Sequence, residues 1–185
     1  MIVNLPAAFS TQLTYEQATR AISLCNSYSR LPSIIDLSFS VGFDDWLRLL
    51  GEEWQCCDNI SQNIEGLLNE SPFCDLLDDP LEHRHLMMTE QENALLQALP
   101  ESVVVYRGCY QSNKWGWCWT LDRSVAEKFP AQHRYKQDGQ PLLVKARIER
   151  DKILAYKGDR NEQEIICYRP KHISTSHITR KSGHD

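Results

Sequence analysis

The 185-residue chain lacks the long apolar runs that a lipid bilayer requires. No stretch approaches the ~18 consecutive apolar residues of a membrane-spanning helix. The first ten residues have neither a basic segment nor a long apolar stretch, so we expect no secretory signal. Glycine is sparse, at 8 residues, and neither a Walker loop nor a Rossmann glycine fingerprint occurs. We therefore expect no membrane partner and neither of these glycine-rich nucleotide sites.

The cysteines do not form a recognisable pattern. There are seven, an odd number at irregular spacing, which argues against a disulfide framework and favours a reducing cytoplasm. Cys56 and Cys57 could join His83 and His85 as metal ligands, but adjacent cysteines without a CxxC pair are poor zinc ligands. We expect no metal site.

The composition is that of a folded protein, with 42% hydrophobic and 24% charged residues. The net charge of −5 hides an asymmetry. Residues 1–100 hold 4 Lys and Arg against 15 Asp and Glu, a net of −11, whereas residues 101–185 hold 16 against 10, a net of +6. This split favours a C-terminal part that meets an anionic ligand or polymer. Chance clustering of solvated side chains is the alternative.

The first half has helical periodicity. The Thr-x-x-Gln/Glu pattern of a capping box occurs at Thr14 and again at Thr89. We expect four helices in this half, with Pro32 ending the first helical segment and a loop at residues 72–80.

After Pro100 the pattern becomes that of strands. Asp122 could cap one inserted helix over residues 123–129. The sequence predicts an α+β fold with a helical lobe over residues 1–88 and a mostly antiparallel, strand-rich core over residues 89–185. The expected strands cover residues 102–106, 115–120, 141–149, 152–156, 164–168 and 171–178.

Two segments of the strand-rich half could contact a ligand. In Tyr106-Arg107-Gly108, an arginine at a strand end could present its planar guanidinium to a phosphate, and the glycine would let a ligand approach the backbone. The segment 116–122, with Trp117, Trp119 and Thr120, could form a stacking platform for a planar ring. A surface arginine and a set of core tryptophans are the simpler alternatives.

The third segment is Glu162-Gln163-Glu164, which precedes an apolar strand. Alternation along an extended chain would put both carboxylates on one face, roughly 7 Å apart. One could then act as a base while the other stays charged. A solvated strand start is the alternative.

Taken in order, these segments resemble the R-S-E class of ADP-ribosyltransferases, over roughly residues 89–174. The resemblance implies a split β-sandwich fold and NAD as co-substrate. By the same resemblance the chain is a small bacterial or phage toxin that transfers a single ADP-ribose from NAD to a macromolecular acceptor, either a protein arginine or a nucleic-acid base such as one in RNA. If the chain is toxic, we expect an antitoxin protein to cover the basic cleft.

The resemblance also assigns residue roles. Glu164 would be the catalytic glutamate, and Glu162 would activate the acceptor. Arg107 would bind the NAD phosphates, the Gly108 backbone would meet the carboxamide, and Thr120 would place the ligand and the catalytic glutamate. The family's Ser-Thr-Ser strand falls at residues 118–120, where Cys118 and Trp119 depart from the pattern. Trp117, Trp119 and Tyr135 are alternative candidates for stacking on nicotinamide.

The departure at Cys118 and Trp119 motivates a second hypothesis, a catalytically degenerate module that binds a nucleotide or a partner. A third hypothesis is an adaptor that acts through the acidic helical lobe.

Overall fold

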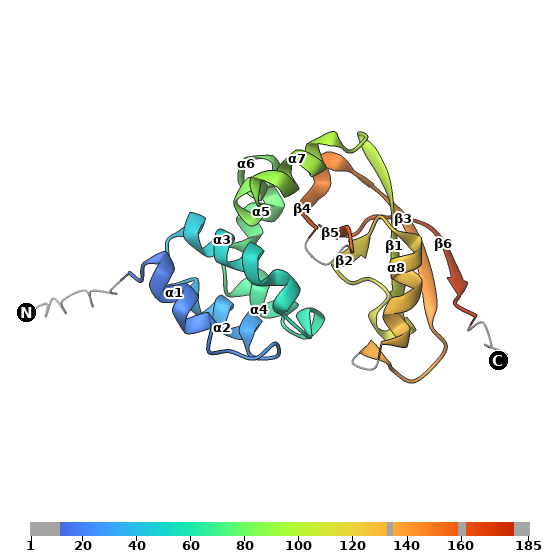
Figure 1. Cartoon of the computed structure of the whole chain (residues 1–185), viewed down its shortest axis with the longest axis horizontal. Helices are drawn as coiled ribbons and strands as arrows, with labels where there is room; N and C mark the ends of the chain where they lie inside the picture. The colour runs from blue at the N-terminus through green and yellow to red at the C-terminus, as the bar shows by residue number, and fades with distance from the viewer. Residues whose placement is uncertain (1–11, 133–134, 159–161, 180–185) are drawn as a thin grey trace, which may run out of the picture. The chain divides into compact units, whose positions relative to one another are not determined.

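The structure is a computed structural model, and it describes residues 12–132, 135–158 and 162–179. It is α+β, as predicted, with helices in the N-terminal region and an antiparallel sheet after residue 100 (Figure 1). The chain divides into two compact units, Met1–Cys74 and Asp75–Asp185. This division falls earlier than the boundary expected at residue 88. The reason is that the buried Arg84 side chain donates hydrogen bonds to the carbonyls of Arg150 and Ile153, within the sheet-bearing unit.

The first unit is helical. Thr14 caps its first helix as predicted, because its hydroxyl accepts from the Gln17 amide and its own amide donates to the Gln17 side chain. The helices enclose a core in which Trp46 donates its indole N–H to the carbonyl of Ile34 at 2.7 Å. They are α1 (Tyr15–Ile22), α2 (Arg30–Leu37), α3 (Phe43–Glu53) and α4 (Ile64–Asn69), with 3-10 turns at Trp54–Cys56 and Ile60–Gln62.

In the described part of residues 1–100 the structure has seven α-helices where four were expected. The helices over Arg30–Leu37, Phe73–Asp78 and Pro80–His83 were not expected, because each has eight residues or fewer and shows little periodicity.

Two further expectations are also wrong. Pro32 does not end a helix but lies in the first turn of α2, where a missing N–H costs nothing because the first amides of a helix have no intrahelical partner. Residues 72–80 are not a loop, because they contain the helix α5 (Phe73–Asp78). Phe73 and Leu76 lie one turn apart and are fully buried, a spacing that the many acidic neighbours obscured.

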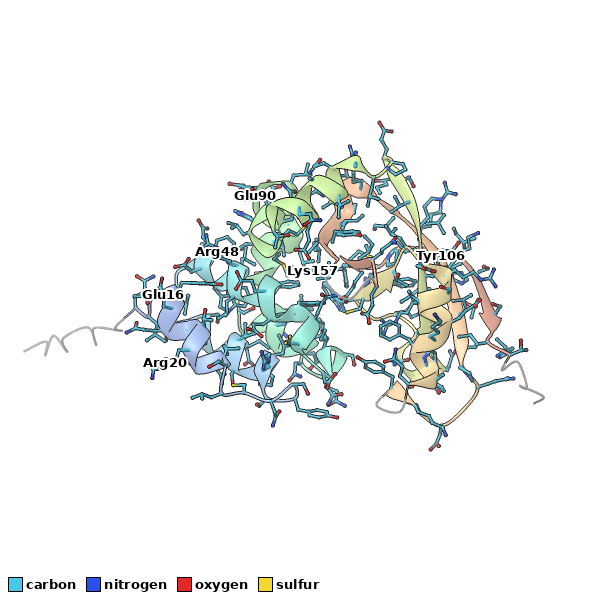
Figure 2. The ribbon with its side chains drawn as sticks, in the orientation of Figure 1. Glu16, Arg20, Arg48, Glu90, Tyr106 and Lys157 are labelled. Atoms are coloured by element: carbon cyan, nitrogen blue, oxygen red, sulfur yellow. The ribbon has the colours of Figure 1, made fainter. Side chains whose placement is uncertain are left out.

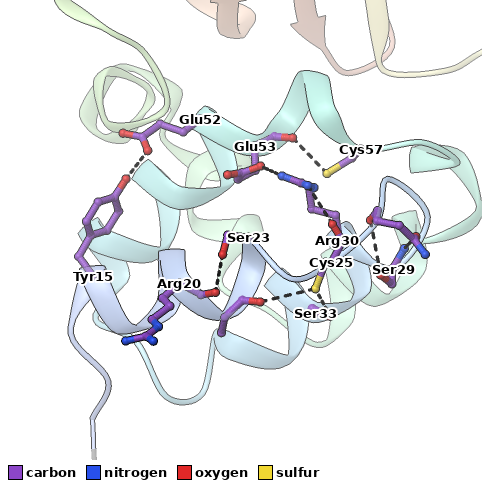
Figure 3. A network of polar contacts seen from close by, with 12 residues as sticks. Tyr15, Arg20, Ser23, Cys25, Ser29, Arg30, Ser33, Glu52, Glu53 and Cys57 are labelled. Atoms are coloured by element: carbon purple, nitrogen blue, oxygen red, sulfur yellow. Dashed lines mark hydrogen bonds and ion pairs between the residues drawn. The ribbon is translucent and has the colours of Figure 1, made fainter.

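A polar network connects the helices of the first unit (Figure 3). Arg30 pairs with Glu53 and also donates to the carbonyl of Cys25 at 3.0 Å, and the Tyr15 hydroxyl donates to Glu52. The thiol of Cys57 donates to the Glu53 carbonyl at 3.2 Å, and burial raises the pKa of Cys57 to about 12. This cysteine is therefore a protonated packing residue at neutral pH.

The second unit is built on one sheet with strand order β4-β5-β2-β1-β3-β6, in which every neighbouring pair is antiparallel. The predicted strands are confirmed, with small differences in length. The split sandwich that the resemblance implies stays a prediction. The strands are β1 (Ser102–Cys109), β2 (Cys118–Thr120), β3 (Leu142–Glu149), β4 (Ile153–Lys157), β5 (Glu164–Cys167) and β6 (Lys171–His177).

Helices cover parts of this sheet. α6 (Pro80–His83) and α7 (Glu90–Ala98) precede it, and α7 packs on β4. The predicted capping box at Thr89 is confirmed. One sheet face carries the apolar core, and Leu96 of α7 belongs to it. Its other members include Val103, Val105, Cys109, Trp119, Val144, Ala146, Ile148, Ile165 and Cys167.

The predicted inserted helix is α8 (Arg123–Lys128), and Asp122 caps it by accepting from the Ser124 amide at 2.7 Å. It lies along β1 (Figure 1). The approach is so close that a Cβ on Gly108 would come within 1.7 Å of the Ala126 carbonyl oxygen. Only glycine permits this contact.

Candidate active site

Two residues predicted to carry chemistry, Thr120 and Glu164, are directly paired, and the strands that bear the three motifs, β5, β2 and β1, are neighbours. Thr120 of β2 pairs directly with Glu164 of β5 on one side and with Tyr106 of β1 on the other. The row continues outward, because Lys157 pairs with Glu164 and Lys145 pairs with Tyr106. Directly opposed residues of an antiparallel pair project to the same face. Five neighbouring strands therefore each place one polar residue in a single row across the sheet: Lys157, Glu164, Thr120, Tyr106 and Lys145. Tyr106 and Lys157 of this row are labelled in Figure 2.

The Thr120 hydroxyl ties the chain before Glu164 to β2. It donates to the carbonyl of Glu162 and accepts from the Asp122 amide at 3.0 Å. Thr120 is buried, with 4% of its surface exposed. This hydroxyl therefore has a positioning role: it fixes the backbone from which the Glu164 side chain projects.

The chain turns at Gln163. Its φ of 44° is left-handed, and its carbonyl accepts from the Leu121 amide at 3.2 Å. Strand β5 begins only at Glu164. The expectation that Glu162 and Glu164 alternate along an extended chain is therefore wrong, because the residue between them is not extended. Glu162 stands before the strand, at a turn clamped to β2.

Arg107 is not in the row. Because its neighbour Tyr106 pairs with Thr120, strand alternation directs the Arg107 side chain to the opposite, core-bearing face. Its guanidinium donates to the carbonyl of Cys118 at 2.5 Å and to the carbonyl of Asn113 at 3.2 and 3.3 Å. The structure thus brings Thr120 and Glu164 together and uses the Arg107 guanidinium to hold the loop between β1 and β2.

The chemistry of the core-bearing face agrees with this position of Arg107. Burial raises the pKa of Cys167 to about 12, although the positive charge of Arg107 acts in the opposite direction. Burial likewise raises the pKa of Cys109, and the Arg107 charge again opposes it. Both thiols belong to the apolar core, on the face to which strand alternation directs the Arg107 side chain.

The two tryptophans predicted as stacking candidates, Trp117 and Trp119, are both buried, at 7% and 2% exposure. Trp119 is 2% exposed, belongs to the apolar core and donates its indole N–H to the Gly116 carbonyl at 2.9 Å. Trp117 stacks on Tyr168, with ring centroids 4.8 Å apart. Tyr135 lies against Phe129, at 5.4 Å between centroids. Trp119 is therefore in the position of a core residue rather than of a stacking platform.

The other two predicted binding residues lie on the face that carries Thr120. Cys118 pairs with Ile166, and alternation along β2 puts its side chain on the same side as Thr120. Gly108 faces α8 on that side, so the helix already occupies the space above its Cα. The predicted contact between the Gly108 backbone and a carboxamide stays a prediction.

A cavity of about 310 Å³ adjoins the turn before Glu164. Gln163 contributes to its wall, which links the cavity to the segment that Thr120 clamps. The other walls come from α7 and from the end of β4. The lining residues are Thr89, Gln91, Glu92, Leu95, Tyr156, Gly158 and Gln163.

A buried ion pair at this cavity was not predicted from the sequence. Lys157 Nζ lies 3.1 Å from Glu92 Oε2, and both side chains are 6% exposed. Glu92 also accepts from the amides of Thr89 and Gly158. Burial acts to raise the pKa of Glu92, but these amides and Lys157 bring it below its ordinary value. The capping-box pattern revealed the contact with Thr89, but the pairing with Lys157 depends on tertiary structure.

Further groupings and comparisons give no additional assignment. Within residues 12–132, 135–158 and 162–179, no three His, Cys, Asp or Glu side chains are grouped as metal ligands would be. Among those same residues, no helix has both the length and the apolar character needed to cross a membrane. No family model matches the chain, and neither the curated proteins nor the solved structures contain a match.

Proposed function

We propose that the chain is an NAD-dependent mono-ADP-ribosyltransferase with Glu164 as its catalytic carboxylate. The observation that carries the proposal is the direct pairing of Glu164 with Thr120, two residues from segments 44 positions apart that the R-S-E resemblance had joined. The second support is the order β5-β2-β1, which makes the three motif-bearing strands neighbours.

The transfer reaction requires a carboxylate beside the ribose of NAD, the role proposed for Glu164. The glycosidic bond between ribose and nicotinamide breaks with its electron pair leaving on nicotinamide, so positive charge develops on the ribose. A glutamate that accepts a hydrogen bond from the ribose 2′-hydroxyl stabilises that charge, as the carboxylates of glycosidases do at their sugar ring. An acceptor nucleophile then forms the new bond to the ribose carbon and gives up its proton, which Glu162 would take as general base.

Arg107 has a different part in this proposal from the one the resemblance implies. Its guanidinium positions the loop 113–118 through two carbonyls, and that loop leads into β2 and Thr120. Contact with the NAD phosphates stays a prediction. Arg107 is therefore first a positioning residue in our account, and its effect on catalysis passes through β2.

Three further parts of the proposal rest on the resemblance. The acceptor is a macromolecule, a protein or a nucleic acid. The enzyme acts as a toxin; its location in the cytoplasm rests instead on the cysteine pattern. An antitoxin neutralises it. A second candidate function is a nucleotide-binding module without transfer, and it is favoured by the engagement of Arg107 with main-chain carbonyls and by the burial of Trp119.

Transfer from labelled NAD tests the proposal. Purified wild-type protein and Glu164→Gln would each be incubated with adenylate-labelled NAD and a cell lysate, and the lysate would be separated into protein and RNase-sensitive fractions. We expect label in one fraction with the wild-type protein and at most background with Glu164→Gln. NAD binding without label transfer would contradict the transferase proposal and favour the nucleotide-binding module. Equal labelling by both proteins would remove Glu164 from the mechanism.

A further inference from the structure

Two exposed segments of the second unit meet through their aromatic rings. The loop before β2 supplies Trp115, 54% exposed, and the turn after β5 supplies Tyr168, 42% exposed. Trp115 meets the His172 ring edge-on at 5.6 Å between centroids, and Trp117 stacks on Tyr168 at 4.8 Å. Trp117 is itself only 7% exposed and backs the Tyr168 ring. We call the set Lys114, Trp115, Tyr168, Arg169 and His172 the aromatic-basic surface.

Each exposed ring of this surface has a cation over it. Lys114 Nζ lies 5.1 Å from the Trp115 ring centre, and the Arg169 guanidinium lies 4.8 Å from that of Tyr168. The sequence around them contains no acid: residues 102–121 and 165–178 have lysine, arginine and histidine but neither Asp nor Glu. The segments that build the surface are thus positive and unopposed by acids of their own.

The Arg107 guanidinium fixes the loop that carries Trp115. Arg107 bonds to the carbonyls of Asn113 and Cys118, which bracket the loop. The guanidinium passes beside Gly116, where a Cβ would come within 2.2 Å of Nη2. The glycine thus makes room for the brace. A braced loop keeps its rings exposed at little further cost in entropy when a ligand binds.

We propose that the aromatic-basic surface binds single-stranded nucleic acid, which deepens the proposed function by naming the acceptor class and in that respect rests on it. Unpaired bases offer flat faces that stack on exposed tyrosine and tryptophan rings, and their phosphates attract nearby lysine and arginine. Exposed cation–π contacts are weak, so Lys114 and Arg169 can move from ring to phosphate as a base arrives. In a duplex the base faces are stacked on one another, so only its phosphates could interact with this surface, through lysine and arginine.

Direct binding tests this proposal without any enzyme assay. The probe is a fluorescein-labelled single strand of about 12 nucleotides, as RNA and as DNA, with the matched duplex as comparison. Anisotropy would be measured at about 50 mM and about 200 mM salt. We expect the wild-type protein to bind the single strand at least about tenfold more tightly than the duplex, because stacking adds to charge.

The variants separate stacking from charge. We expect Tyr168→Ala and Trp115→Ala each to weaken single-strand binding about tenfold, whereas Tyr28→Ala, which removes a 57% exposed tyrosine of the first unit, leaves it unchanged. Arg169→Gln should reduce the salt dependence, and Lys152→Gln, the loss of an equal charge elsewhere in the second unit, should reduce it less. Thermal unfolding of each variant checks that the fold is kept.

Several results would overturn the inference: no binding of any strand by the wild-type protein, equal affinity for single strand and duplex, or unchanged binding in both aromatic variants. Binding of polyglutamate as tight as that of RNA would likewise reduce the surface to a polyanion site. The Glu164→Gln variant distinguishes this inference from the proposed function. If Glu164→Gln binds RNA while the wild-type protein transfers no label, nucleic-acid binding is supported and the transferase proposal is rejected. If the wild-type protein transfers label but neither protein binds a strand, the transferase proposal is supported and nucleic-acid binding is rejected.

Discussion

The Thr120 hydroxyl makes two hydrogen bonds that neither valine nor alanine could replace. It donates to the Glu162 carbonyl and accepts from the Asp122 amide, so it joins the turn before Glu164 to the cap of α8. In a buried position each of these main-chain groups would otherwise lack its partner. The position of the candidate catalytic carboxylate therefore depends on a side chain in another strand.

Removing this hydroxyl tests its positioning role. We expect Thr120→Val to lower the free energy of unfolding by about 1–3 kcal/mol, because two buried main-chain groups lose their partner, and to reduce nicotinamide release as well. Thr120→Ser keeps the hydroxyl and should keep most of the activity, with a loss of about 1 kcal/mol for the buried methyl group. Urea unfolding and a nicotinamide assay measure the two effects. If valine and serine behaved alike, the hydroxyl would have no positioning role.

At the scale of single residues, the motifs associated Thr120 with Glu164, which the structure pairs, but they did not show the face on which Arg107 lies. Motif order alone associates the three residues. The face of a strand residue depends on register, and register depends on pairing between segments far apart in sequence. Trp119 was uncertain for the same reason: a tryptophan beside a motif can be a platform or a core residue, and only the packing of β2 on the core decides.

The contact between β1 and α8 depends on one missing side chain. Gly108 lies under the Ala126 carbonyl, whereas Gly66 of α4 has only ordinary contacts, with Ile35 at 3.6 Å as the nearest atom to an added Cβ. We expect Gly108→Ala to cost about 3 kcal/mol or more through overpacking against backbone. Gly66→Ala should be neutral or stabilising by up to about 1 kcal/mol, because alanine favours a helix. Equal effects in urea unfolding would contradict this packing.

The pair Glu92–Lys157 connects α7 to β4 and gives the fold a pH dependence. The folded state lowers the pKa of Glu92 from its ordinary value near 4.5, so its contribution to stability is complete above that pH. The contribution is lost as pH falls through the lower, folded pKa. We expect Glu92→Gln to be less stable than wild type at neutral pH by about 3–5 kcal/mol. The difference should shrink in acid, where wild-type Glu92 also becomes neutral.

Urea midpoints of wild type and Glu92→Gln from pH 7 down to about 3 measure this difference. Glu90→Gln is the matched control, because Glu90 is exposed in the first turn of the same helix. A constant gap between wild type and Glu92→Gln across that range would contradict the assigned direction of the pKa shift.

Most elements could be predicted from periodicity, and the failures have physical causes. The strands after residue 100 have β-branched runs or alternation, which act locally and are visible in the sequence. The helix at Phe73–Asp78 was missed because it is short and flanked by prolines, and its stability comes from burying Phe73 and Leu76. Burial of that kind cannot be inferred from a single short window.

At the scale of the whole molecule, the unit boundary changes the meaning of the charge asymmetry. The acidic segment between Asp75 and Glu92 belongs to the second unit, not to the helical first one. Residues 1–74 have 3 Lys and Arg against 9 Asp and Glu, a net of −6, and residues 75–185 have 17 against 16, a net of +1. The positive charge is therefore a property of the strands and loops after residue 100, not of a whole unit.

Two fragments test the boundary. We expect residues 75–185 to fold cooperatively when expressed alone, because this fragment keeps Arg84 on the carbonyls of Arg150 and Ile153 and keeps the buried Met87. Residues 89–185 lack both and should be less stable by about 2 kcal/mol or more, from the loss of Met87 burial alone. Urea unfolding followed by circular dichroism compares them. Equal stability would favour the boundary expected from the sequence.

Nicotinamide release by purified protein tests the central claim most directly. Wild type, Glu164→Gln and Glu162→Gln would be given NAD alone and then NAD together with the lysate fraction that the wild-type protein labels. We expect Glu164→Gln to lose at least about 100-fold in both reactions, and Glu162→Gln to keep most of its NAD hydrolysis while transfer falls. Undiminished nicotinamide release by Glu164→Gln, or none by wild type under any of these conditions, would contradict the assignment of Glu164 as the catalytic carboxylate.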